Sequence, residues 1–540
     1  MPGAIHLPCC FALKSERHES YLRYVHEDTD ETTYGQLQLN GEDAVNPFTR
    51  FDSEPSQLHE GLVHIRCRYN RKYWVPRQRG GGWWIVADAH EPEEDLDSPN
   101  CTLIKPIISV TNPKDDDAAT TKPAVKVKDD DAATTEPVVR VKDDDATTEP
   151  VNVMTVRFVH AGNAQPGKDM RMTFSGDSGT AACMCVVVSD AKHEHDDGGD
   201  AFTVLNFARS PRRLPRFLVF KGHNDLYLSG VTINDTNYLQ FSASDPGDPT
   251  VVHEIRYPGR EGVVIVRNIH LDRYWADTEG QWILALYTPQ EMQRPPVASW
   301  FTTVDVKDYF AISPYDMSGT LYFLKNVTRD DFTNCLNVDF WNRTITADAR
   351  IRVEEAVLDR EIYNVEYRLR EARVYDTSVL TMATTAAVND TSRENTKRLT
   401  LAYEESEMST WDATLELKFG FQSRIRAGFP KLGLGATVNI SAEFFGAYNW
   451  GETMEKTVSH EVEYEVTVPP KTKVTVSLIA TRSAVDVPFN YRQRDIMSTD
   501  GGARDVAMTD GLYTGINSYN FKFQTTEEKL KARRLAPTPP

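Results

Sequence analysis

Residues 411–445 read WDATLELKFGFQSRIRAGFPKLGLGATVNISAEFF, and apolar and polar residues alternate along most of this stretch. Alternation predicts β-strands with one apolar face, because successive side chains of a strand point to opposite sides. The apolar residues have odd numbers up to Phe429 and even numbers from Leu432 onward. A turn at Pro430-Lys431 would place both sets on one face, so we predict a long amphipathic hairpin.

Two interpretations fit this hairpin, which we expect over residues 412–445. A strand that crosses a bilayer needs about 9–11 residues and alternates lipid-facing apolar residues with polar residues that face water. A long hairpin packed on a soluble sheet shows the same alternation. The two states can follow one another. A lone hairpin in lipid has unpaired edges that only neighbouring subunits can satisfy, so the hairpin can rest on the soluble sheet until subunits assemble and then insert. The predicted lipid face comprises Leu415, Leu417, Phe419, Phe421, Ile425, Leu432, Leu434, Val438 and Ile440, and the predicted tip is Phe429, Pro430 and Lys431.

The sequence contains an internal repeat. Residues 60–74, EGLVHIRCRYNRKYW, match residues 261–275, EGVVIVRNIHLDRYW, and shorter matches continue on both sides. Both copies consist of short alternating runs interrupted by Gly, Pro, Asn and Asp, which predicts two homologous all-β domains. The first copy carries an extra acidic, repetitive segment at residues 114–150 that has no aromatic residue. Such a composition does not bury enough apolar surface to fold, so we expect a disordered insert.

The pattern changes from about Leu358 onward, where the alternating runs become longer. Residues 460–480, HEVEYEVTVPPKTKVTVSLIA, alternate Val, Tyr and Leu with Glu, Thr and Ser on both sides of the Pro469-Pro470 pair. This pattern predicts a third, distinct domain of extended antiparallel strands.

The composition favours a soluble protein without a nucleic-acid partner. The 540 residues include 79 acidic and 60 basic ones, for a formal charge of -19, which disfavours binding to a polyanion. There is no apolar run of about 18 residues to span a bilayer as a helix, and the apolar stretch near residue 1 is too short for a secretory signal. Seven cysteines without a CxxC pair fit reduced thiols. We therefore expect a cytoplasmic protein.

Two stretches carry residue types that are typical of catalytic or metal sites. GDSGT at residues 176–180 is similar to the nucleophile segment of chymotrypsin-like proteases, but Ser178 has no histidine in the usual upstream context to act as its base. The tract His193–Asp197 has no further ligand set at zinc-like spacing nearby. We expect no enzyme activity, no metal and no cofactor.

Aromatic residues near turns suggest a binding role instead. Trp83 and Trp84 follow the turn RGGG, and Trp282 occupies the position of Trp84 in the second repeat. An aromatic face in such a place can stack on a sugar ring, whereas packing in the core is the alternative. We expect Trp84 and Trp282 in the core and Trp83 as the exposed contact.

The two repeats resemble the agglutinin domains of plant amaranthin-like lectins. The resemblance rests on KSERHESYLRY, EGLVHIRCRYNRKYW and WWIVADAHEPEED in the first repeat and on FKGHNDLYLSG, LQFSASDPGDP and NIHLDRYW in the second. The last third, with AGFPKLGLGATVNISAEFFGAYNWGETMEKT and YEVTVPPKTKVTV, resembles the aerolysin and epsilon-toxin family of pore-forming proteins. Together these resemblances imply an all-β chain: a β-trefoil at residues 1–212, a second at 213–356 and an elongated aerolysin-like antiparallel domain at 357–540.

The lectin resemblance also implies a sugar site. Galactose- or N-acetylgalactosamine-type glycans are the family's ligands, and its sugar-contacting loop corresponds here to Gly81, Gly82, Trp83 and Trp84. The two glycines replace polar residues of the family pattern, and the aromatic pair is kept.

We therefore expect a glycan-binding lectin that forms homo-oligomers and then inserts its hairpin into a membrane, in plant defence or stress response. The alternative is a non-lytic interaction protein whose third domain only mediates assembly.

Overall fold

The computed structural model describes most of the chain. The described residues are 6–15, 18–26, 33–44, 46–111, 153–163, 169–174, 182–187, 201–207, 214–258, 263–278, 281–306, 309–316, 320–329, 331–340, 343–413, 422–498 and 500–530. The acidic insert, the GDSGT segment and the His193–Asp197 tract therefore lie outside the description.

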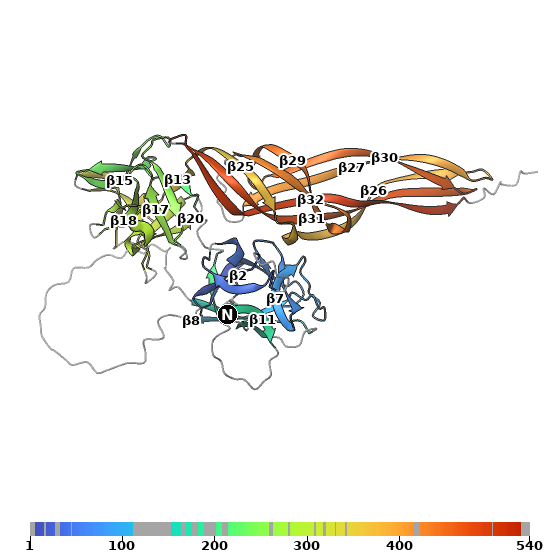
Figure 1. The fold of residues 1–540 in the computed structure, drawn as a ribbon, viewed down its shortest axis with the longest axis horizontal. Coiled ribbons are helices and arrows are strands. Elements are labelled where there is room, and N and C mark those ends of the chain that lie inside the picture. The colour runs from blue at the N-terminus through green and yellow to red at the C-terminus, as the bar shows by residue number, and fades with distance from the viewer. Residues whose placement is uncertain are drawn as a thin grey trace, which may run out of the picture.

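Within the described residues the regular structure is β-strand with short 3-10 turns, and no α-helix occurs. The predicted all-β class is confirmed. The strands form three separate sheets in chain order, and Figure 1 shows two rounded units followed by one elongated unit.

The first unit is one sheet of twelve strands. Its core surrounds Trp74, which is fully buried and meets the Phe51 ring edge-on at 4.9 Å. The strands are β1 Cys10–Ser15, β2 Ser20–Tyr24, β3 Leu37–Gly41, β4 Phe51–Pro55, β5 Val63–Cys67, β6 Tyr73–Arg79, β7 Gly82–Ala89, β8 Ile104–Thr111, β9 Val153–His160, β10 Asp169–Phe174, β11 Ala182–Val187 and β12 Phe202–Asn206, with a 3-10 turn η1 at Pro47–Thr49.

The second unit repeats this plan with twelve strands around Trp275, the counterpart of Trp74. The bridge between Gln240 and Cys335 corresponds to the bridge between Gln38 and Cys183 in the first unit. The assignment of both units as β-trefoils stays a prediction. The strands are β13 Phe217–Lys221, β14 Tyr227–Ile233, β15 Thr236–Ala243, β16 Val252–Arg256, β17 Val263–Asn268, β18 Arg273–Asp277, β19 Ile283–Tyr287, β20 Phe301–Val306, β21 Tyr309–Pro314, β22 Leu324–Arg329, β23 Phe332–Val338 and β24 Arg352–Glu355, with 3-10 turns η3 Glu291–Gln293, η4 Val297–Ser299 and η5 Ala347–Ala349.

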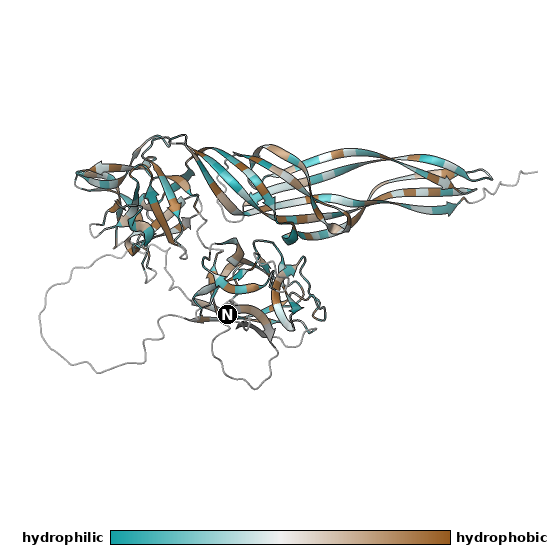
Figure 2. Cartoon of the chain, in the orientation of Figure 1, coloured by the Kyte–Doolittle hydropathy of each residue, from teal (hydrophilic) through white to brown (hydrophobic). Residues whose placement is uncertain are grey.

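The third unit is an eight-stranded sheet in the order β29-β28-β25-β31-β32-β27-β30, with β26 paired to β31. Its strands run along the long axis of the molecule, and hydrophilic and hydrophobic residues alternate along them (Figure 2). The strands are β25 Val357–Tyr367, β26 Arg373–Asn389, β27 Asn395–Ala413, β28 Gln422–Leu432, β29 Val438–Asn449, β30 Thr453–Val468, β31 Thr472–Met497 and β32 Ala503–Lys529, with 3-10 turns η6 Leu369–Glu371 and η7 Leu434–Ala436.

This unit is held by two separate apolar cores rather than one. One surrounds Trp411, and the other lies between β26, β27, β30 and β31 around Leu401, Val466 and Val476. Alternation explains the second core. Val466 and Val468 of β30 are buried, while Glu465 before them and Thr467 between them are exposed.

Candidate functional site

An amphipathic hairpin exists, but it is formed by β28 and β29 over residues 422–449 rather than 412–445, because residues 412 and 413 belong to β27. Its turn is also not where the sequence predicted it. Strands β28 and β29 pair antiparallel with Pro430 opposite Ile440, and the chain reverses over residues 433–437. Gly435 has a φ of +69°, a backbone conformation that glycine adopts without steric cost. Pro430 stays inside β28 at a register shift that follows Gly428, because a bulge tolerates the missing N–H of proline. The predicted tip at Phe429, Pro430 and Lys431 is therefore wrong.

Part of the predicted lipid face is buried within the third unit. Ile425 and Leu432 are 1% and 6% exposed and belong to the core around Trp411, and Phe429 and Val438 pack against the same core. Leu434 and Ile440, near the turn, are instead 77% and 46% exposed. Leu415, Leu417, Phe419 and Phe421 lie outside the described residues. The hairpin thus rests with one face on a soluble sheet, which is the second of the two predicted states.

The hairpin is joined to the rest of the sheet along a short ladder. β28 pairs in parallel with β25 through Glu361–Arg424 and Ile362–Ile425, and β29 is the edge strand beyond it. On the polar face Arg424 forms an ion pair with Asp359. Lys431 reaches Glu407 of β27 at 2.5 Å. The hairpin is therefore held in place mainly by hydrophobic packing and a few polar contacts. Backbone hydrogen bonds to β25 contribute less.

The predicted sugar loop is the tip of the β6–β7 hairpin. Gly80 and Gly81 have φ values of +55° and +84°, and Arg79 pairs with Gly82 on either side of this turn. A Cβ on Gly82 would lie 3.2 Å from the indole nitrogen of Trp84. That nitrogen donates a hydrogen bond to the carbonyl oxygen of Arg79 at 3.1 Å. The glycines therefore form the turn and make room for the indole.

The two tryptophans of this loop face opposite sides, in the reverse of the predicted arrangement. Trp83 packs against the core of the first unit, on the same side of β7 as Ile85, whereas Trp84 is not part of that core. Both indoles remain partly exposed. Sequence alternation predicted the opposite faces, but which face meets the core depends on the closure of the whole sheet. Sugar binding by Gly81, Gly82, Trp83 and Trp84 stays a prediction.

A polar interface between the first and third units was not predicted from the sequence. Arg373 at the start of β26 donates from Nε to the carbonyl oxygen of His90 at 2.6 Å. Nδ1 of His90 lies 3.3 Å from the backbone nitrogen of Val374. The backbone nitrogen of Asp376 donates to Glu91 at 3.0 Å. The loop after β7 therefore docks on the first residues of β26.

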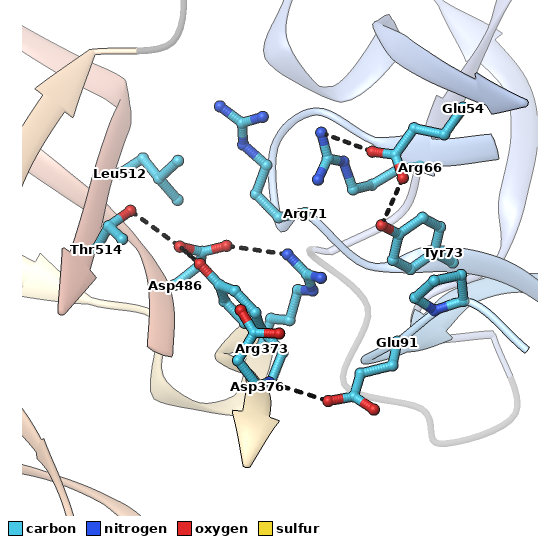
Figure 3. Close-up of a pocket in the computed structure, with 12 residues that line it drawn as sticks. Glu54, Arg66, Arg71, Tyr73, Glu91, Arg373, Asp376, Asp486, Leu512 and Thr514 are labelled. Carbon is cyan, nitrogen blue, oxygen red and sulfur yellow. Dashed lines mark hydrogen bonds and ion pairs between the residues drawn. The ribbon is translucent and has the colours of Figure 1, made fainter. Parts of the chain in front are cut away.

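A cavity of about 680 Å³ lies along this interface (Figure 3). Arg373 contacts Asp486 at 3.3 Å and lies over the rings of Tyr375 and Tyr73, at 3.9 and 5.4 Å from their centroids. Tyr73 in turn donates to Glu54 at 2.8 Å. Many donors and acceptors of the lining are paired with one another. We therefore interpret the cavity as part of the contact between the units and not as a ligand site. The lining residues are Glu54, Arg66, Arg71, Tyr73, Glu91, Pro92, Arg373, Tyr375, Asp376, Asp486, Leu512 and Thr514.

A buried carboxyl group lies in the same interface. Glu371 of η6 is 3% exposed, and its carboxyl group lies beside the hydroxyls of Tyr34 and Tyr69 in the first unit. Burial raises the pKa of Glu371 to about 7. Hydrogen bonding from the Tyr34 and Tyr69 hydroxyls and the charges of Arg368 and Lys72 oppose this shift only in part.

The side chains that could bind a metal or form a disulfide are placed by the structure only within the described residues. In that part of the chain no group of His, Cys, Asp and Glu side chains is arranged to hold a metal ion. None of the seven cysteines forms a disulfide, and all but Cys9 are buried. The described ranges also contain no helix long and apolar enough to cross a membrane.

Comparison with known proteins identifies the domain classes. An agglutinin domain model matches residues 5–115 and 212–350, and an aerolysin toxin model matches residues 346–498. The chain therefore joins agglutinin domains to an aerolysin toxin domain, as predicted.

Curated relatives point the same way. Natterin-1 of Thalassophryne nattereri is 28% identical over 173 residues, which cover 32% of this chain and 47% of natterin-1. Natterin-3 of the same species is 33% identical over 166 residues, which cover 31% of this chain and 45% of natterin-3. The chain thus spans about half the length of the curated relatives it matches.

Solved structures give only distant likenesses. A lamprey immune protein aligns with a TM-score of 0.29 and 14% identity over 59% of this chain and 93% of its own. The hemolytic lectin CEL-III aligns with a TM-score of 0.28 and 9% identity over 95% of this chain and 92% of its own. Scores this low establish no shared fold.

Proposed function

We propose that the chain is a glycan-binding, pore-forming protein. Its first two units bind glycans of the galactose or N-acetylgalactosamine type on a target surface, and the chain then assembles into a homo-oligomer. In the oligomer the β28–β29 hairpin leaves the third unit and contributes to the wall of a membrane β-barrel. The agglutinin and aerolysin matches support the two halves of this proposal.

The observation that carries the pore-forming half is the attachment of the hairpin. It is amphipathic, it lies at the sheet edge, and among the residues that the structure describes it shares only two residue pairs with β25. Release therefore breaks few backbone hydrogen bonds of the third unit, and the main cost is exposure of the apolar face. Lipid takes over that face in a barrel, and neighbouring hairpins pair its free edges.

The other parts of the proposal follow from the composition and the resemblance. The protein is cytoplasmic, acts without enzyme chemistry or a cofactor, binds no nucleic acid, and functions in plant defence or stress response. The negative charge of -19 supports the absence of a nucleic-acid partner.

Release of dye from liposomes that carry defined glycolipids tests the function. We expect release from liposomes with a recognised glycan and ring-shaped oligomers in electron micrographs of the product. Binding and oligomers without release would support the non-lytic assembly protein instead. Absence of binding to any glycan-bearing liposome would overturn the lectin half.

A further inference from the structure

Three aromatic side chains of the second unit form a cluster where three hairpins meet. Tyr238 lies in β15, Trp282 directly precedes β19, and Phe332 is the first residue of β23. Their ring centroids are 4.7 Å apart for Tyr238–Phe332, 5.5 Å for Trp282–Phe332 and 6.2 Å for Tyr238–Trp282. The rings are tilted or edge-on to one another, so none fully covers the face of another. We call Tyr238, Trp282 and Phe332 the aromatic cluster.

The aromatic cluster is not part of the hydrophobic core of the second unit. That core surrounds Trp275, and the partly buried side chains packed on it include Tyr257 and Tyr322 but no member of the aromatic cluster. All three clustered side chains are partly exposed. The guanidinium of Arg329, an exposed residue, lies over the Trp282 ring at 5.0 Å from its centroid. The aromatic cluster is therefore a surface feature with a cationic donor beside it.

Polar groups border the aromatic cluster. Asn337 pairs with Trp282 across an antiparallel bridge, so both side chains lie on the same face of the sheet. Asn337 is 3% exposed, and its Nδ2 has no hydrogen-bond partner among the described residues. A buried donor without a partner is costly and calls for an explanation.

The first unit does not repeat this arrangement. The equivalent bridges Gln38–Cys183 and Gln240–Cys335 align Tyr238 with Gln36. Gln36 is 3% exposed and carries no ring. Trp84 aligns with Trp282, but its indole is bound to the carbonyl oxygen of Arg79 within its own hairpin. The fold that the two units share therefore does not by itself explain why the second unit has the aromatic cluster.

We propose that the aromatic cluster of the second unit is a saccharide-binding platform that takes a single pyranose ring. The C–H face of a pyranose is apolar and packs on aromatic faces that are only partly exposed to water. Its hydroxyl groups need polar groups at the rim, where the guanidinium of Arg329 lies over the Trp282 ring. A few placed polar groups around an apolar floor are typical of small-ligand sites. This inference rests on the proposed glycan binding and moves its principal site from the Trp83 loop to the second unit.

The test uses the full-length chain on a glycan array, followed by titration with the soluble sugars that bind. We expect Trp282→Ala and Phe332→Ala to weaken binding by about tenfold or more, equivalent to about 1.4 kcal/mol. Trp282→Phe retains a ring and should keep most of the affinity. Phe340→Ala is the matched control, because Phe340 is 38% exposed on the same unit and contacts Tyr322 outside the aromatic cluster.

The outcomes separate this inference from the proposed function. Wild-type binding that persists in both alanine variants overturns the platform but leaves glycan binding standing. Absence of any glycan binding by the wild-type chain overturns both. If Trp282→Ala lowers the melting temperature, its loss of binding could reflect unfolding. The binding of Phe332→Ala and the change in tryptophan fluorescence on addition of sugar then test the platform. That change should be lost in Trp282→Phe while binding is retained, and a change that persists in Trp282→Phe contradicts the platform.

Discussion

Arg373 of the third unit donates a hydrogen bond to the carbonyl oxygen of His90 in the first unit, with an N–O distance of 2.6 Å. The same guanidinium pairs with Asp486 of β31, which is 4% exposed. One side chain therefore neutralises a buried charge in the third unit and docks the first unit against it. Arg373 thus connects an agglutinin domain physically to the sheet that carries the hairpin.

Arg373→Ala should destabilise the third unit and loosen this docking. Loss of one partner from a buried ion pair costs about 3–5 kcal/mol. The charges of Arg66 and Arg71, which also act on Asp486 across the cavity, place the expected cost near the lower end of that range. For a unit of this size we expect a melting temperature lower by about 10 °C. Arg398→Ala is the control, since its pair with Glu463 at 3.6 Å is exposed and should contribute little. Equal melting temperatures for both variants would contradict the role of Arg373.

The docking of the first unit should weaken as the pH rises. Burial between the units holds the pKa of Glu371 at about 7, above its ordinary value of 4.5, so the docked state binds this proton more tightly than the undocked state. The stabilisation is complete below the ordinary pKa and is lost as the pH rises through about 7. Small-angle scattering should therefore show a larger radius of gyration above pH 7 than below it.

Glu371→Gln removes the titrating group and serves as the test of this assignment. The neutral amide imitates the protonated acid, so the radius of gyration should stay low across the whole range. Glu366→Gln, an exposed acid on β25 of the same unit, should leave the wild-type pH response in place. A response that persists in Glu371→Gln would assign it to another group.

The sequence predicted the hairpin strands but could not predict their turn. Alternation and the phase change near Pro430 pointed to a turn there, because proline is common in turns. In the structure, Pro430 lies within β28 at a register shift after Gly428. Gly435 and Ala436, which have left-handed backbone conformations, form the turn between β28 and β29. A local pattern reports the face of each residue but not the partner strand that fixes the register.

Contacts between units were beyond the reach of sequence patterns for a similar reason. Glu371 stands in the polar stretch RLREAR, which suggests an exposed turn. Its burial arises from Tyr34 and Tyr69, more than 300 positions earlier in the chain. The aromatic cluster was missed because Tyr238 and Phe332 are distant in sequence from Trp282, and only the pairing of three hairpins brings them together.

A disulfide between β25 and β28 should lock the hairpin in its resting place. Glu361 and Arg424 are directly paired in the parallel ladder, so Glu361→Cys combined with Arg424→Cys places two thiols within reach of a disulfide. The oxidised variant should bind glycan-bearing liposomes without releasing dye, and a reductant should restore release. Each single cysteine variant controls for the native thiols, of which Cys9 is exposed. Dye release by the oxidised protein would mean that the hairpin does not need to leave β25.

Ile440→Arg should separate membrane insertion from resting stability. Ile440 is 46% exposed in the resting unit, so arginine is tolerated there, whereas Ile425 is buried and any charge at its position would also disturb the core. In the barrel, position 440 is predicted to face lipid, where arginine costs up to about 2–4 kcal/mol near the bilayer centre. We expect an unchanged melting temperature, retained glycan binding and loss of dye release.

Asn439→Arg provides the matched control for this variant. Asn439 is the adjacent, exposed residue of β29 and lies on the opposite face, which lines water in the predicted barrel. Equal net charge at neighbouring positions makes the two variants differ mainly in the face that carries the charge. Dye release should therefore be lost in Ile440→Arg and kept in Asn439→Arg. The reverse result would show that the membrane-facing side of the hairpin is the polar set, and loss in both would point to a general intolerance of charge in β29.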